Sequence, residues 1–158
     1  PFVRKVLLVA AEKGLEVDLE QATPHRPTPG FLAASPFRTM PAMTDGAFSL
    51  PDSSAIAHYL EALAPDPPLL PGEPRERGKA VWFEEFADTI LAGPAGAVGF
   101  SRTIGPRLLG LPPNELAAQA GEAQAGPMLD WLETQVPGSG WLTGSTYSLA
   151  DIAVASCL

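Results

Sequence analysis

The stretch Ser35-Pro-Phe-Arg-Thr-Met-Pro-Ala-Met-Thr-Asp-Gly-Ala-Phe-Ser-Leu-Pro-Asp-Ser-Ser-Ala-Ile-Ala-His-Tyr-Leu60 decides the fold of this 158-residue chain. After Met40-Pro41 comes an Asp-Gly pair between two short apolar runs, the strongest local signal for a β-hairpin. Asp52-Ser53-Ser54 then opens an amphipathic helix. The free N–H groups at a helix start favour a carboxylate, and the extended backbone at Met40 offers a hydrogen-bonding edge. The pattern therefore predicts a site for a short peptide that lies flat.

The residues before this stretch show first the apolar spacing of a helix and then that of a strand. Residues 2–13 have apolar side chains at i, i+3, i+4 and i+7, which predicts a helix. Leu15-Glu-Val-Asp-Leu19 alternates apolar and acidic residues, which predicts a strand with one solvated face. His25 to Ala34 is rich in proline, so we expect a loop with at most a short helix. The order of helix, strand, loop, hairpin and helix is typical of a thioredoxin-like unit that lacks its first strand.

The later residues show only helical spacing. The helix that begins near Asp52 carries its apolar stripe as far as Leu63, and the proline-rich residues 65–72 form a linker. We expect a long helix in the 80s that Gly93-Pro94 kinks or ends, and a second helix over 113–135 that Gly126-Pro127 bends or splits. A third helix starts after Ser148, which forms a capping box with Asp151. The expected domains are 1–64 and 73–158, the second being incomplete.

Composition narrows the class of function. A net charge of −8 and a pI of about 4.6 argue against nucleic acid or an anionic membrane as the main partner. The single cysteine, Cys157, excludes an internal disulfide and is expected to be a small buried residue, and two histidines without ligand spacing leave no metal site. No run of 18 apolar residues occurs. We therefore expect a cytoplasmic protein, in which an anionic substrate would need a local basic spot.

The stretch from Ser35 to Leu60 resembles the glutathione-binding half of the glutathione transferase superfamily. The family pattern is Asn-Pro, four residues, Pro, a strand, Asp-Gly, a strand, and Glu-Ser-x-Ala-Ile-x-x-Tyr-Leu. Here Ser35 replaces the first Asn and Asp52 replaces the Glu, and the other positions agree. Tyr147-Ser-Leu-Ala-Asp-Ile152 is similar to the signature of the family's helical domain. The resemblance implies an α/β thioredoxin-like N-terminal domain followed by an all-α helical domain, in a bacterial-type cytosolic member truncated at both ends.

The resemblance also implies roles for individual residues toward glutathione. The Ser53 hydroxyl and N–H would bind the γ-glutamyl carboxylate, and Asp52 would approach the ammonium group; the alternative is that either residue simply caps the helix. The backbone of Met40 would pair with the cysteinyl part, before a cis Pro41. Arg38 would bind the glycine carboxylate, although a solvated loop arginine is nearly as plausible. Thr39 is a weaker polar candidate.

A second, apolar substrate would need a hydrophobic wall. Phe2, Trp82 and Phe86, with Phe83, are candidates by position, and plain core packing is the alternative for each. Acidic residues on the same segment, Glu84, Glu85 and Asp88, are expected to form a solvated helix face.

The resemblance implies a glutathione transferase, commonly a homodimer, that uses glutathione as substrate or cosubstrate against small electrophiles. The thiol-activating residue of such enzymes would precede Pro1, so no catalytic residue is named and the chain as given is expected to be inactive or feeble. Two alternatives stay open: a binding or scaffold protein of the same fold without turnover, and a glutathione-dependent isomerase or dehalogenase.

Overall fold

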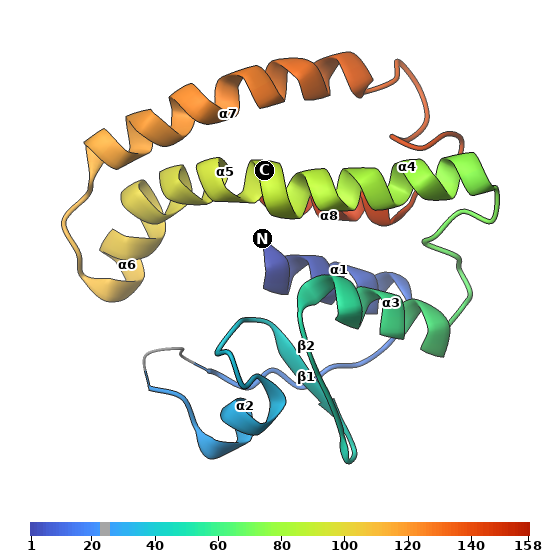
Figure 1. The fold of residues 1–158 in the computed structure, drawn as a ribbon, viewed down its shortest axis with the longest axis horizontal. Helices are drawn as coiled ribbons and strands as arrows, with labels where there is room; N and C mark the ends of the chain where they lie inside the picture. Colours follow the sequence, from blue (N-terminus) through green and yellow to red (C-terminus); the bar gives the residue numbers. More distant parts are fainter. Residues whose placement is uncertain (23–25) are drawn as a thin grey trace. The chain divides into compact units, whose positions relative to one another are not determined.

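The computed structural model describes residues 1–22 and 26–158, which form two compact units, Phe2–Leu70 and Pro71–Leu158 with Pro1. Figure 1 shows a mixed helix and strand unit at the N-terminal end and a purely helical unit after it. This is the predicted fold class, a small α/β unit followed by an all-α unit. The expected loop over 25–34 begins at His25, which lies outside the described residues, and it contains the short helix α2 (Pro29–Ala34).

Besides α2, the first unit contains two neighbouring helices and a hairpin. Helix α1 (Phe2–Glu12) packs against α3 (Ser53–Leu63), and strands β1 (Ala42–Asp45) and β2 (Phe48–Pro51) pair antiparallel. The turn is Gly46-Ala47, and the positive φ of 57° at Gly46 is the geometry that glycine adopts most easily. The predicted hairpin and the predicted helix after it are both confirmed. The apolar side chains buried in this unit are Val9, Ala10, Ala34, Ile56, Ala57, Leu60, Leu69 and Leu70.

The predicted strand over residues 15–19 is wrong. These residues have no regular secondary structure, and the described part of the chain contains one two-stranded sheet, β1 with β2. A strand exists only where a neighbouring strand takes its backbone hydrogen bonds, and alternation of side chains cannot supply that neighbour. Leu19, expected on the buried face, is 70% exposed. The apolar stripe predicted on α3 likewise ends before Leu63, which is exposed.

A buried ion pair attaches the end of the first unit to its helices. Lys13 follows α1 and pairs with Glu61 of α3, and its Nζ also donates to the carbonyl of Pro67 at 2.5 Å. The Glu61 carboxylate accepts hydrogen bonds from the N–H groups of Leu69 and Leu70 at 3.1 to 3.2 Å. One charged pair therefore supplies the backbone partners that this proline-rich segment cannot find in a helix or strand.

The second unit begins with one continuous helical segment. It passes without a break through α4 (Pro74–Glu85), the π-helical turn η1 (Phe86–Leu91), α5 (Ala92–Gly99), the π-helical turn η2 (Phe100–Ile104) and α6 (Gly105–Leu109). The expected end of the helix at Gly93-Pro94 is wrong: the chain passes through a wider turn just before this pair, in which Ala92 N–H bonds to the carbonyl of Ala87, five residues back. A π turn shifts the hydrogen-bond pattern just where Pro94 cannot donate, so the helix continues.

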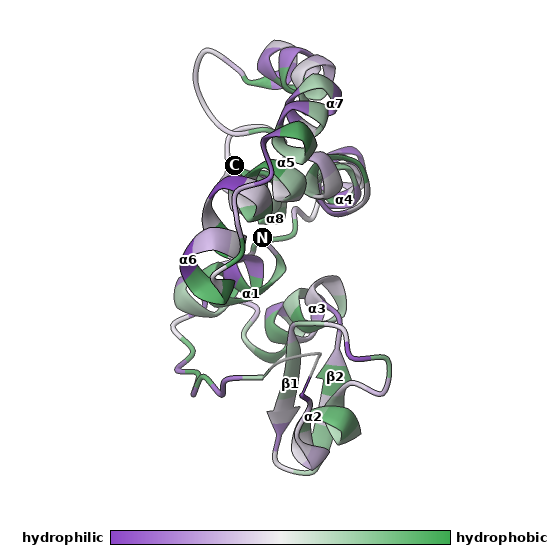
Figure 2. Cartoon of the chain, turned by 90° about the vertical axis from the view of Figure 1, so that its left-hand side faces the viewer, coloured by the Kyte–Doolittle hydropathy of each residue, from purple (hydrophilic) through white to green (hydrophobic). Residues whose placement is uncertain are grey.

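Helix α7 (Glu115–Gln135) runs through Gly126-Pro127 as a single helix of 21 residues, so the expected split is wrong. Figure 1 shows it as a gently curved helix beside α5, and Figure 2 shows hydrophilic and hydrophobic residues along it. The contact with α5 depends on Gly121, where an added Cβ would lie 2.7 Å from the carbonyl oxygen of Pro94. Packing of α7 along α5 maintains the helix where local propensity would break it.

Helix α8 (Leu149–Cys157) packs against α4 and fills the centre of the second unit. The predicted capping box is confirmed: the N–H of Ser148 donates to Asp151 Oδ2 at 2.9 Å. Cys157 is buried as expected, and its thiol donates to the carbonyl of Ala87. The expected solvated face is wrong at Glu84, which is 2% exposed, whereas Glu85 is exposed. Burial of an acidic residue cannot be read from helical spacing alone.

Candidate functional site

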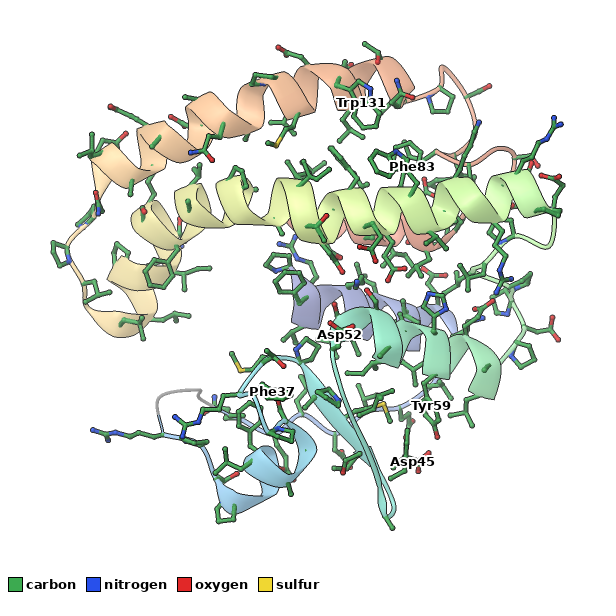
Figure 3. The ribbon with its side chains drawn as sticks, in the orientation of Figure 1. Phe37, Asp45, Asp52, Tyr59, Phe83 and Trp131 are labelled. Carbon is green, nitrogen blue, oxygen red and sulfur yellow. The ribbon has the colours of Figure 1, made fainter. Side chains whose placement is uncertain are left out.

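The start of α3 is built by Asp52. Its Oδ1 accepts hydrogen bonds from the N–H groups of Ser54 and Ala55 at 2.9 and 3.0 Å, so Asp52 caps the helix. Asp52 also has a φ of +80°, a conformation that a non-glycine residue adopts at a cost. The capping alternative is therefore correct for Asp52, and the backbone at this position is held in an unfavourable conformation. Figure 3 shows Asp52 at the beginning of α3.

Ser53 is the first residue of α3, and the cap does not use its donors. Within residues 1–22 and 26–158 no hydrogen bond involves the Ser53 N–H or hydroxyl, in keeping with the unsatisfied donors of a first helical turn. The residue is 3% exposed, so these donors are held in a fixed place. The helix dipole and the two donors together favour a carboxylate.

A direct hydrogen bond joins the helix start to the Met40-Pro41 pair. The N–H of Asp52 donates to the carbonyl of Pro41 at 3.2 Å, and the peptide bond between Met40 and Pro41 is cis, as the resemblance implies. Within the described residues the main chain of Met40 has no hydrogen-bonding partner, and its side chain is exposed. The structure thus brings Met40, Pro41, Asp52 and Ser53 together with backbone groups free at both ends.

The loop before Met40 is closed by Ser35, a residue whose role sequence reasoning missed. The Ser35 hydroxyl donates to the carbonyl of Thr39 at 2.8 Å and accepts from the N–H of Thr39 at 2.9 Å. The Thr39 hydroxyl lies 3.2 Å from the same oxygen, so Thr39 is engaged in the loop itself. Arg38 lies inside this closed loop with a φ of +60°, and its side chain is exposed. The sequence signal that could have indicated this role is the serine at position 35, where the family pattern has asparagine.

Phe86, a predicted wall residue, lies in the core of the helical unit. Its ring lies 4.9 Å from the ring of Trp131, and Phe83 is also buried against Trp131. In Figure 3, Phe83 on α4 and Trp131 on α7 point toward each other. Core packing, the alternative left open by the sequence, is therefore correct for both phenylalanines. Trp82 is 49% exposed, and Phe2 is half-buried at the start of α1.

A second contact missed by sequence reasoning fixes the hairpin to α3. The Tyr59 hydroxyl donates to Asp45 Oδ2 at 2.6 Å, and the Tyr59 ring lies 5.2 Å from that of Phe48. The hydrogen bond to Asp45 raises the pKa of Tyr59. Figure 3 shows Asp45 and Tyr59 next to each other. The two strands that separate Pro41 from Asp52 are thus anchored to the helix.

No cluster of possible metal ligands occurs among residues 1–22 and 26–158. In the same part of the chain no helix is long and apolar enough to cross a membrane.

The fold and the arrangement at Met40-Pro41 and Ser53 define a class of protein, the two-part thioredoxin-like and helical proteins. Comparison with known protein families shows which family within this class the chain belongs to. Residues 1–68 match the family "Glutathione S-transferase, N-terminal domain", and residues 115–158 match "Glutathione S-transferase, C-terminal domain". A glutathione S-transferase from Hyoscyamus muticus is 31% identical over 96% of this chain and 74% of its own length. The chain belongs to the glutathione S-transferase family.

Two further comparisons show how wide this family is. A theta class glutathione S-transferase from Xanthomonas axonopodis pv. citri, solved with glutathione bound, has a TM-score of 0.81 and 26% identity over 98% of this chain and 74% of its own. Elongation factor 1-gamma from Schizosaccharomyces pombe is 30% identical over 96% of this chain and 36% of its own length. The same pair of units therefore occurs in proteins with different names.

Proposed function

We propose that this protein binds glutathione and conjugates its thiolate to small hydrophobic electrophiles. The observation that carries the proposal is the hydrogen bond from Asp52 N–H to the carbonyl of Pro41, which joins the unpaired backbone edge at Met40 to the helix start where Ser53 keeps its donors. A tripeptide with a carboxylate at its γ-glutamyl end needs both features. The similarity to a theta class structure with glutathione bound supports the assignment.

Each part of glutathione has a partner in this chain. The Ser53 N–H and hydroxyl bind the γ-glutamyl carboxylate, while Asp52, whose Oδ1 caps the helix, presents its negative charge to the ammonium group. The N–H and C=O of Met40, before Pro41, pair with the cysteinyl residue as an added strand does. Arg38 binds the glycine carboxylate, the local positive charge that an anionic ligand needs on a chain of net charge −8.

The reaction that follows is nucleophilic substitution or addition. Glutathione loses its thiol proton, and the sulfur forms a bond to an electrophilic carbon. In a substitution, a leaving group departs with the electrons of its bond. In an addition, the sulfur attacks one end of an activated double bond, and the electrons of that double bond take up a proton. Lowering the thiol pKa from its free value of roughly 8.5 increases the thiolate fraction at neutral pH. No residue of the chain is assigned to this activation. Phe2 and Trp82 remain our candidates for contact with the electrophile.

The proposal also covers the location, the oligomeric state and the domain boundaries of the protein. We place it in the cytoplasm as a homodimer that removes reactive electrophiles, with residues 1–64 as the glutathione-binding domain, 65–72 as the linker and 73–158 as the helical domain. Support comes from the family membership and from an acidic composition with one buried cysteine.

The similarity to elongation factor 1-gamma favours one alternative, a binding or scaffold protein without turnover. Retention of this chain on immobilised glutathione, combined with turnover of a chloro-dinitrobenzene by a version extended to carry the thiol-activating residue expected before Pro1, tests both. The proposed function predicts retention and formation of the thioether. Retention without turnover favours the alternative, and loss of both contradicts glutathione binding itself.

A further inference from the structure

The loop that carries Arg38 and Met40 is organised by one fully buried hydroxyl group. Ser35 is 0% exposed, and its side chain bonds to both the N–H and the C=O of Thr39. Its own main chain is used as well: the Ser35 N–H donates to the carbonyl of Phe31 in α2 at 2.7 Å, and the Ser35 carbonyl accepts from Arg38 N–H at 3.0 Å. Four hydrogen bonds thus connect Ser35 to α2 on one side and to the loop on the other.

These bonds fix the backbone conformation of the residues proposed to bind glutathione, Arg38 and Met40. Thr39 directly precedes Met40, and the Ser35 hydroxyl fixes both the N–H and the C=O of Thr39. Met40 therefore has little freedom to change the direction of its own N–H and C=O. Arg38 lies between the two anchored residues at a φ of +60°, a conformation that is unfavourable for a non-glycine residue and persists only when its surroundings impose it. The bond from Arg38 N–H to the Ser35 carbonyl and the closure at Thr39 supply that constraint.

We propose that Ser35 is a positioning residue of the glutathione site: without touching the ligand, it holds Arg38 and Met40 in the orientation that binds the glycine and cysteinyl parts. This inference rests on the proposed function. It assigns the ligand-binding geometry of the 35–41 loop to one buried side chain, whereas the geometry at Ser53 depends on Asp52. The γ-glutamyl end should therefore be recognised independently of Ser35.

The experiment compares Ser35→Ala with Thr28→Val as a matched control. Thr28 is a second hydroxyl residue of the same region, and its Oγ1 accepts from Phe31 N–H at 3.1 Å to cap α2. Each variant loses one hydroxyl group that bonds to backbone, and both are expected to lower the melting temperature. Only Ser35→Ala should weaken glutathione binding in calorimetry, by about tenfold, because only Ser35 bonds to Thr39. Ser35→Thr, which retains the hydroxyl, should recover the affinity.

A second ligand distinguishes positioning from general loss of stability. The wild type should prefer glutathione over γ-glutamylcysteine, which lacks the glycine carboxylate, and Ser35→Ala should reduce that preference, whereas Thr28→Val should keep it. If Ser35→Ala binds glutathione as tightly as the wild type, or if Thr28→Val loses the same affinity, the inference is wrong. If the wild type itself does not bind glutathione, the proposed function fails. Faster hydrogen exchange in Ser35→Ala at Arg38 N–H, which bonds to the Ser35 carbonyl, then still supports control of the loop, and unchanged exchange contradicts it.

Discussion

At the scale of single residues, Asp52 combines a structural and a proposed binding role that two substitutions can separate. Asparagine is as good a helix N-cap as aspartate, so Asp52→Asn should retain the hydrogen bonds to Ser54 and Ala55 and leave the free energy of unfolding nearly unchanged. It removes the negative charge proposed to face the ammonium group of glutathione. We expect about tenfold weaker binding, about 1.4 kcal/mol, measured by calorimetry.

Asp52→Ala is the comparison, since it removes both cap and charge. It should lose about 1 kcal/mol of stability in urea unfolding in addition to the same affinity. Wild-type affinity in Asp52→Asn would assign Asp52 to capping alone.

Arg38 is predicted to show a conflict between stability and binding. Because glycine adopts a φ of +60° without a Cβ penalty, Arg38→Gly should unfold with a free energy about 1 kcal/mol higher than Arg38→Ala, which keeps the penalty. Both variants should bind glutathione more weakly than the wild type because both lack the guanidinium group. Chemical unfolding and calorimetry on the same pair check this; equal stability of the two variants would show that the backbone conformation at this position carries no cost.

At the scale of secondary-structure elements, α7 tolerates residues that break helices. Gly126 has no neighbour within 4 Å of an added Cβ, so Gly126→Ala should raise the free energy of unfolding by about 1 kcal/mol. Gly121 provides the matched control, since its Cβ would lie 2.7 Å from the Pro94 carbonyl oxygen and force α7 away from α5. Gly121→Ala should therefore destabilise the protein in the same unfolding assay. Stabilisation by both substitutions would contradict the close approach of these helices.

The ion pair between Lys13 and Glu61 is predicted to hold residues 67–70 in place. Glu61→Ala leaves a buried ammonium group and two backbone N–H groups without their partner, which should cost about 3 kcal/mol in unfolding free energy. The N–H groups of Leu69 and Leu70 should exchange with solvent much faster, as measured by hydrogen exchange. Replacing the surface residue Glu85 with alanine is the control and should change neither quantity. Unchanged protection of Leu69 in Glu61→Ala would show that the pair does not hold this segment.

The elements that sequence predicted correctly are those whose signals are local. The hairpin follows from Asp45-Gly46, and the start of α8 follows from Ser148 and Asp151, because turns and caps are decided by neighbouring residues. Residues 15–19 fail as a strand because pairing requires a distant partner. Gly126-Pro127 does not split α7, because packing along α5 outweighs local propensity. In the proposed site, the motif predicts that Asp52 and Ser53 stand at a helix start, and their role toward glutathione stays a prediction. The closure of the loop by Ser35 is visible only in three dimensions.

At the scale of the whole molecule, two units with different construction belong to one family. The first unit contains all five residues proposed to bind glutathione, and it holds them through backbone hydrogen bonds rather than through a cluster of charges. Its proposed ligand groups combine unpaired backbone donors and acceptors at Met40 and Ser53 with the positive charge of Arg38, which would let a strongly acidic chain recognise an anionic tripeptide. The second unit contributes an aromatic core around Trp131.

The central claim is that glutathione lies between the backbone of Met40 and the first turn of α3. The most direct test is titration of nitrogen-15-labelled protein with glutathione, observed as amide chemical shifts by NMR. The account predicts that the N–H signals of Met40 and Ser53 shift together and saturate at the same glutathione concentration. Saturable shifts confined to other parts of the chain, with both of these signals unmoved, would contradict it.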